Sequence, residues 1–168
     1  WIAGPTQTKT VGALDVGSSD LEFGCEAVGG GDPQLVGIRF NNITIPKGAL
    51  ITRAYIQFTV DATAKNTDPV DVWIKTQASD NAPAFNTATP FDISSRTMIA
   101  DSVNWLIPAG SWATVGAAGA DQATADLKQL VQNIVDRNGW ASGNSMVFTL
   151  KGTGVREAEA FDGSPTDA

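Results

Sequence analysis

The chain has 168 residues and a mass of 17.5 kDa, a size typical of a single domain. Apolar residues make up 42% of the sequence and charged residues only 17%, a composition too apolar for a disordered chain. The net charge is −7 and the 11 lysines and arginines are scattered, so we expect no nucleic-acid partner. No run of about 18 apolar residues occurs, so no membrane insertion is expected either.

The sequence contains no histidine. This absence excludes Ser-His-Asp and Cys-His catalysis, zinc sites ligated by histidine and a histidine general base. The single cysteine, Cys25, has no partner for an internal disulfide and is expected to be a small buried apolar residue. An enzyme built from this chain would depend on carboxylates, lysines, Tyr55 or Cys25. We therefore expect a protein that is not an enzyme.

Short alternating runs separated by Gly, Pro and Asn dominate the chain and predict β-strands. The predicted strands cover residues 35–40, 49–60, 70–76 and 145–150. In residues 70–76 (VDVWIKT), apolar side chains alternate with a second set that contains Asp71, Trp73 and Lys75. This alternation is typical of an antiparallel strand with one buried face and one face toward solvent.

Residues 121–137 depart from the alternating pattern. Their apolar residues have helical spacing and form one stripe: Leu127, Leu130, Val131, Ile134 and Val135. We therefore predict a mostly β protein, an antiparallel β-sandwich with one α-helix around residues 121–137 packed across it. Residues 1–168 are expected to form one module, in which residues 1–14 are a candidate extended arm.

The order of several segments resembles that of a known module: SSDLEF (18–23), VGIRFNNITIPKGALITRAYIQFTVD (36–61), ISSRT (93–97), the stretch 112–154 and EAFDG (159–163). This order resembles a module of secreted bacterial and marine proteins, and it is similar to DNRLRE-type carbohydrate-binding modules. The resemblance covers most of residues 18–163. It implies a jelly-roll-like sandwich, a secreted or cell-surface location, and a role in binding or adhesion rather than catalysis.

The five tryptophans are candidates for polysaccharide binding, because exposed aromatic planes offer a stacking surface and polar neighbours add hydrogen bonds. Trp73 shares a predicted strand face with Asp71 and Lys75, and these three residues are the leading ligand-binding candidates. Trp105 and Trp112 are further candidates at a loop rim, with packing in the core or under a loop as the alternative. We expect the ligand to be a polysaccharide or a cell-surface glycan.

The four glutamates lie near the two ends of the chain. First and last strands of a sandwich are often neighbours, so these carboxylates are expected to converge with nearby aspartates. Ca²⁺ prefers such oxygen ligands. The candidate ligands of a structural calcium ion are Asp20, Glu22, Glu159 and Asp162, and the alternative is a solvated acidic patch. The spacing of Glu157 and Glu159 also permits a glycosidase pair, but a small sandwich seldom supplies the deep cleft that this requires.

A rival hypothesis is a structural subunit of an extracellular filament, sheath or surface layer. Modules of the resembled type continue after the DGS segment into a final apolar strand, which residues 1–168 do not contain. Either the sequence was cut before that strand, or the sandwich has an open slot. In the second case, an unpaired sheet edge would take a strand from another molecule. The candidate for that strand is TQTKTVGALDV (6–16) of a neighbouring chain, and the hypothesis predicts self-association through sheet edges.

Overall fold

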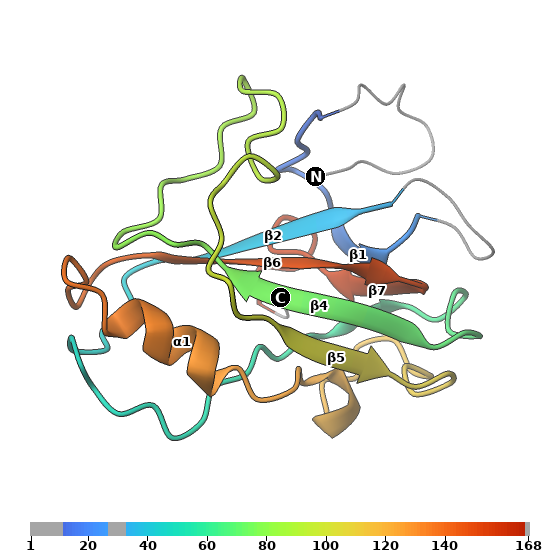
Figure 1. The fold of residues 1–168 in the computed structure, drawn as a ribbon. Helices are drawn as coiled ribbons and strands as arrows, with labels where there is room; N and C mark the ends of the chain where they lie inside the picture. Colours follow the sequence, from blue (N-terminus) through green and yellow to red (C-terminus); the bar gives the residue numbers. More distant parts are fainter. Residues whose placement is uncertain (1–11, 27–32, 167–168) are drawn as a thin grey trace.

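The computed structural model describes residues 12–26 and 33–166, which form two antiparallel sheets packed face to face (Figure 1). The first sheet has the strand order β1-β7-β3, where β1 is Asp20–Gly24, β7 is Val155–Glu159 and β3 is Val60–Ala62. The second has the order β2-β6-β4-β5, where β2 is Leu35–Phe40, β6 is Met146–Thr153, β4 is Val70–Thr76 and β5 is Val103–Ile107. The predicted mostly β sandwich with one helix is confirmed.

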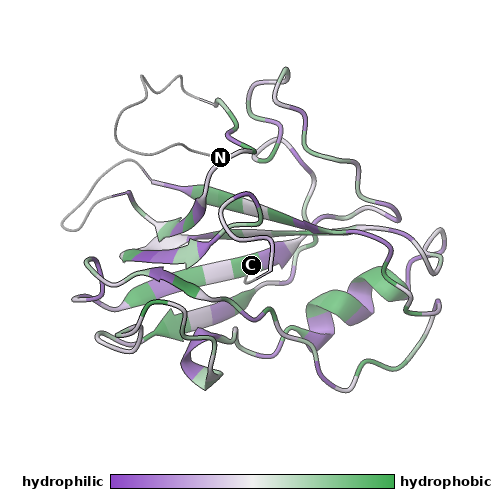
Figure 2. Cartoon of the chain, turned by 180° about the vertical axis from the view of Figure 1, so that it is seen from behind, coloured by the Kyte–Doolittle hydropathy of each residue, from purple (hydrophilic) through white to green (hydrophobic). Residues whose placement is uncertain are grey.

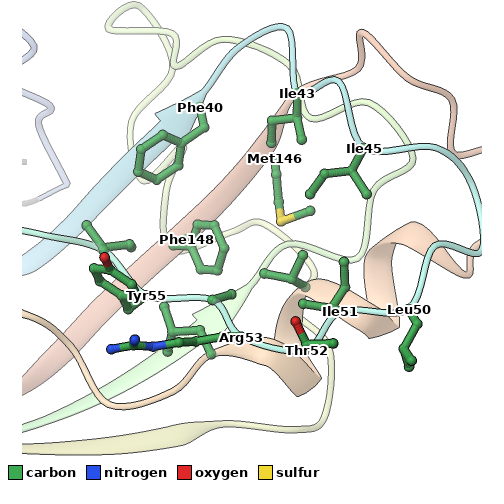
Figure 3. Close-up of a pocket in the computed structure, with 14 residues that line it drawn as sticks. Phe40, Ile43, Ile45, Leu50, Ile51, Thr52, Arg53, Tyr55, Met146 and Phe148 are labelled. Atoms are coloured by element: carbon green, nitrogen blue, oxygen red, sulfur yellow. The ribbon is translucent and has the colours of Figure 1, made fainter.

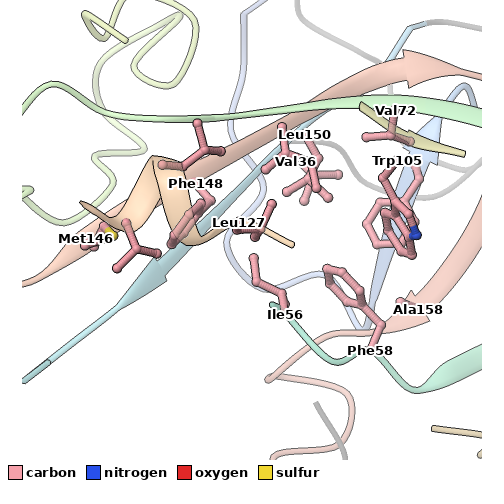
Figure 4. Close-up of a cluster of buried hydrophobic side chains, with 14 of the residues drawn as sticks. Val36, Ile56, Phe58, Val72, Trp105, Leu127, Met146, Phe148, Leu150 and Ala158 are labelled. Carbon is pink, nitrogen blue, oxygen red and sulfur yellow. The ribbon is translucent and has the colours of Figure 1, made fainter. Parts of the chain in front are cut away.

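The core fills the space between the two sheets. Along β4, Val70, Val72 and Ile74 are fully buried and alternate with more exposed residues, and the same alternation of apolar and polar colours runs along several strands in Figure 2. Aromatic rings fill one part of this core, where the Phe58 and Trp105 rings stack with centroids 5.6 Å apart (Figure 4). The alternation in the sequence therefore sets which face of each strand is buried.

Three of the four predicted strands form where expected. β2 and β4 have the predicted bounds, and β6 extends three residues past the predicted end. The strand predicted over 49–60 is wrong for most of its length, because regular pairing begins only at Val60. Residues 54–58 instead bond irregularly to residues 122–127, where the Thr124 hydroxyl and an Asp126 carboxylate oxygen accept backbone N–H groups. Side chains replace main-chain partners there, so no continuous ladder forms.

The predicted helix is shorter than expected. A 3₁₀ turn covers Ala120–Gln122, and the α-helix α1 covers only Lys128–Val135. The start of the predicted segment is not helical, because the N–H groups of Thr124 and Leu127 bond to the carbonyls of Ile56 and Ala54. The apolar stripe is confirmed, since all five of its residues are buried. The helix lies at one end of the strands, with a hydrophobic and a hydrophilic side (Figures 1 and 2).

A buried arginine holds together loops near the start of β4. The Arg156 side chain, on β7, is 1% exposed and donates hydrogen bonds to the carbonyl oxygens of Lys65, Asp68 and Pro108 at 2.9, 2.6 and 3.0 Å. Hydrogen bonds from a charged donor are stronger than neutral ones. Arg156 therefore ties the loop before β4 and the loop after β5 to the last strand.

Candidate functional site

The outer face of the four-stranded sheet carries one exposed tryptophan. Trp73 lies on β4 with 51% of its surface exposed, because its neighbours Val72 and Ile74 take the buried side of the strand. Asp71 is exposed and Lys75 is half-buried on the same face. The structure thus brings the three leading ligand-binding candidates together in one row, as strand alternation requires.

Neighbouring strands extend this row into a surface that is mostly polar, with the 60% exposed Leu106 opposite Asp71. Across the ladders, Trp73 is opposite Lys151 on β6 and Asn104 on β5, and both partners are exposed. The Asn104 amide donates a hydrogen bond to the Asp71 carboxylate, which fixes the position of one acceptor beside the ring. We call Asp71, Trp73, Lys75, Asn104 and Lys151 the Trp73 face. It combines one aromatic plane with hydrogen-bonding groups and two lysines.

The other two tryptophan candidates are buried. Trp105 is 5% exposed and Trp112 is fully buried, and their ring centroids lie 6.3 Å apart in the core. The Trp112 indole N–H donates to the carbonyl oxygen of Asp121 at 3.0 Å, so its polar atom is satisfied inside the protein. Their assignment as ligand-binding residues is therefore wrong, and the packing alternative applies. An interior ring offers no stacking surface to a ligand.

Carboxylates from the two ends of the chain do converge. β1 pairs with β7, and Asp20, Glu22 and Glu157 place carboxylate oxygens within 4.8 Å of one another. A lysine lies among them: Lys65 Nζ is 2.5 Å from Glu157 Oε1, 3.5 Å from Glu22 Oε1 and 2.8 Å from the carbonyl oxygen of Glu26. We call Asp20, Glu22, Glu157 and Lys65 the carboxylate cluster.

Burial sets the electrostatics of this cluster. Burial raises the pKa of Glu22 above its ordinary value, and the charge of Lys65 opposes only part of that shift. Burial alone would lower the pKa of Lys65, but the hydrogen bond and charge of Glu157 raise it. Glu22 Oε2 is buried with no hydrogen-bond partner among the described residues. The folded protein thus holds a charged lysine against carboxylates, one of which resists ionisation.

The predicted calcium ligands are only partly brought together. Asp20 and Glu22 belong to the cluster, but the third carboxylate there is Glu157. Glu159 is opposite Asp20 on the β1–β7 ladder, and Asp162 follows in an exposed turn. Both line a groove between β2 and residues 55–58. Sequence alternation places Glu157 and Glu159 on one strand face. Only the pairing register, in which Glu157 is opposite Glu22, distinguishes between them.

An apolar groove runs along one open side of the sandwich, and the sequence did not reveal it. Its walls are β2 and residues 50–58, and Figure 3 shows Phe40 and Tyr55 on the two sides with Phe148 between them. A wider part of about 720 Å³ and a narrower part of about 360 Å³ share Phe40, Tyr55 and Ile56. The sequence analysis missed the groove because it predicted a regular strand over residues 49–60. The irregular pairing of residues 50–58 instead leaves this side of the sandwich uncovered.

Comparison with known proteins gives no match: no family model, no curated protein and no solved structure matches the chain. The resemblance to DNRLRE-type carbohydrate-binding modules therefore stays a prediction. Within residues 12–26 and 33–166, none of the helices has the length and hydrophobicity needed to cross a membrane.

Proposed function

We propose that this protein is a secreted, non-catalytic binding module that recognises a polysaccharide through the Trp73 face. The observation that carries the proposal is the exposed indole of Trp73 in the middle of a mostly polar sheet surface. Tryptophan is enriched at interaction sites, because its side chain combines a large apolar plane with a polar N–H group. A sugar ring would stack on the indole while its hydroxyl groups bond to Asp71 and Asn104.

The charges beside the ring refine the ligand class. Lys151 lies directly across the ladder from Trp73, and Lys75 follows two residues along β4. Two cations on this face contrast with the net charge of −7 of the whole chain. Because opposite charges favour association, a polysaccharide with carboxylate or sulfate groups fits this surface better than a neutral one.

The state of the carboxylates supports binding over catalysis. Glycoside hydrolysis needs one carboxyl group as acid and another as base or nucleophile, both facing a substrate. Here Glu157 is 9% exposed and its carboxylate is bonded to Lys65, while Glu22 is 7% exposed. Of the pair Glu157 and Glu159, only Glu159 lines the groove, so the two carboxyl groups do not face a common substrate there, and we assign Glu22 and Glu157 a structural role.

A calcium ion at the carboxylate cluster would be structural. The three carboxylates supply oxygen ligands of the kind that Ca²⁺ prefers, and the orphaned Glu22 Oε2 adds a free acceptor. However, Lys65 already lies against Glu157 and supplies a positive charge there. We therefore propose that calcium competes with Lys65 for this position.

The binding proposal is tested by affinity electrophoresis of the full chain in gels containing neutral, carboxylated or sulfated polysaccharides. We expect retardation in at least one acidic gel, and loss of that retardation in Trp73→Ala. Val115→Ala is the control, because Val115 is a 59% exposed apolar residue that lies outside both the Trp73 face and the groove. Retardation that survives Trp73→Ala, or that is lost equally in Val115→Ala, would overturn the proposal.

A second candidate function is a structural subunit of an extracellular filament, sheath or surface layer. The observation that favours it is the apolar groove between β2 and residues 50–58, which is open to an added strand. Self-assembly and glycan binding would use different surfaces, so evidence for one does not exclude the other.

A further inference from the structure

The groove has the geometry of a missing strand position. β2 is the edge strand of its sheet, so in the described part of the chain no strand lies on its outer side. On the other side of the groove, residues 50–58 lead into β3, an edge strand of the other sheet. The strand that pairs with β3 is β7, and it ends at Glu159 without extending alongside residues 50–58. The groove thus lies between two edges, one from each sheet, which is the arrangement that strand addition uses.

The backbone of residues 54–58 leaves groups available on the groove side. Ile56 bonds through its N–H and C=O groups to Thr124, and the Phe58 N–H bonds to the Gln122 carbonyl oxygen. Successive residues of an extended chain direct these groups to opposite sides. The N–H groups of Tyr55 and Gln57 therefore point away from residues 122–124, and neither has an acceptor within residues 12–26 and 33–166.

Several side chains of the groove are both apolar and exposed. Phe40, Tyr55 and Phe161 line it with exposed fractions of 39%, 48% and 70%, and Leu50 at the narrow part is 83% exposed. Isolated exposed apolar residues are ordinary, but a contiguous set along two unpaired edges indicates an interaction surface. An extended peptide would bury these side chains and bond to the free backbone groups at the same time.

The structure also indicates which peptide is near. Phe91 donates a backbone hydrogen bond to the Gly12 carbonyl, and Leu14 and Val16 line the wide part of the groove. The described part of the chain therefore begins beside the groove at residue 12, and residues 1–11 precede it in the sequence. Eleven extended residues span about 36 Å, and residues 50–58 span about 30 Å, so the lengths match. Three alternating threonines, Thr6, Thr8 and Thr10, favour an extended conformation.

Charge supports the same occupant. Lys9 is the only charged side chain in residues 1–11, whereas the wide part of the groove contains three carboxylates, from Asp15, Glu159 and Asp162, and one cation, Arg39. Because Leu14 and Val16 already form part of this wall, a chain filling its own groove would have to reverse direction just before them. The same segment of another molecule enters without that reversal.

We propose that the groove binds residues 1–11 of a second copy of this chain as an added β-strand. The strand lies between β2 and residues 50–58, with Lys9 near the carboxylates of the wide part. This surface is separate from the Trp73 face, so the inference does not depend on glycan binding. Repetition of the contact from copy to copy would give a chain of subunits, because each molecule has one arm and one groove.

The test is light scattering of the full chain across a range of concentrations. We expect oligomers that dissociate on dilution, and a monomer at all concentrations for the chain starting at residue 12 and for full-length Phe161→Asp. Val115→Asp is the matched control, because Val115 is 59% exposed but lies outside the groove, and it should still assemble. Circular dichroism checks that each variant is folded.

A labelled peptide of residues 1–11 gives a second readout on the chain starting at residue 12. We expect saturable binding, weakened about tenfold by Phe161→Asp in the protein and about fivefold by Lys9→Glu in the peptide. A full chain that is monomeric at every concentration, or assembly that persists without residues 1–11, would overturn the proposal. A groove that binds no peptide would overturn it as well.

Discussion

The two kinds of tryptophan in this protein should respond to truncation in opposite ways. Trp112 is fully buried against Trp105 and Phe23, and its indole N–H satisfies the Asp121 carbonyl. Removing a buried tryptophan side chain costs about 3–5 kcal/mol of unfolding free energy, and the orphaned carbonyl adds about 1 kcal/mol. Trp112→Ala should therefore lose about 4–6 kcal/mol, much of the stability of a typical domain.

Urea denaturation followed by circular dichroism measures this loss. With a slope of about 2 kcal/mol per molar urea, the unfolding midpoint of Trp112→Ala should fall by about 2–3 M. Trp73→Ala is the matched comparison, because half of that ring is already in water. Its unfolding free energy should change by about 1 kcal/mol or less. A Trp112→Ala midpoint within about 0.5 M of the parent would refute the assignment of this ring to the core.

Three further predictions concern charged residues. Burial raises the pKa of Glu22, so its stabilising effect is fully present below its unfolded pKa and is lost as the pH rises through the folded pKa. Glu22→Gln should therefore gain unfolding free energy relative to the parent as the pH rises above the ordinary glutamate pKa of about 4.3 in urea titrations, and a difference that does not change with pH would contradict this. Lys65→Met removes the cation from the carboxylate cluster. It should lower Tm in EDTA, and millimolar calcium should restore part of the loss; no calcium response would argue against an ion site there. Lys151→Glu should weaken retardation in acidic polysaccharide gels more than in neutral ones, and equal effects in both would exclude a role for the Lys151 charge.

Sequence periodicity predicted the elements whose burial depends on one repeating face. Alternation placed Trp73 outside and Val72 inside on β4, and helical spacing identified the buried stripe around Leu130. The same reasoning failed for residues 49–59, because an alternating segment forms a ladder only if a partner supplies regular backbone groups. Asp126 and Thr124 accept some of these bonds through side chains, which no pattern within 49–59 reveals.

The candidate sites were predictable to a similar extent. The sequence predicted that carboxylates from the two ends of the chain converge, because first and last strands are often neighbours. It did not predict that Glu157 rather than Glu159 joins the cluster, because this depends on the pairing register. Lys65 was not anticipated, because it enters the cluster from the loop between β3 and β4. For Trp105 and Trp112, the sequence did not decide between a core position and a surface position, since an aromatic residue in a short strand or loop fits either. The groove could not be predicted, because it forms between two sheets whose relative position the sequence does not reveal.

The pairing of β1 with β7 also has a mechanical consequence. Asp20 is opposite Glu159, so the chain enters β1 and leaves β7 at the same end of one ladder. Tension applied between residues 12 and 166 would therefore load the backbone hydrogen bonds of this ladder one after another, as in a zipper, rather than all together in shear. A module of this topology yields at low force from its termini. Under tension, the carboxylate cluster would be pulled apart early, because Asp20 and Glu22 leave with β1 while Glu157 stays with β7.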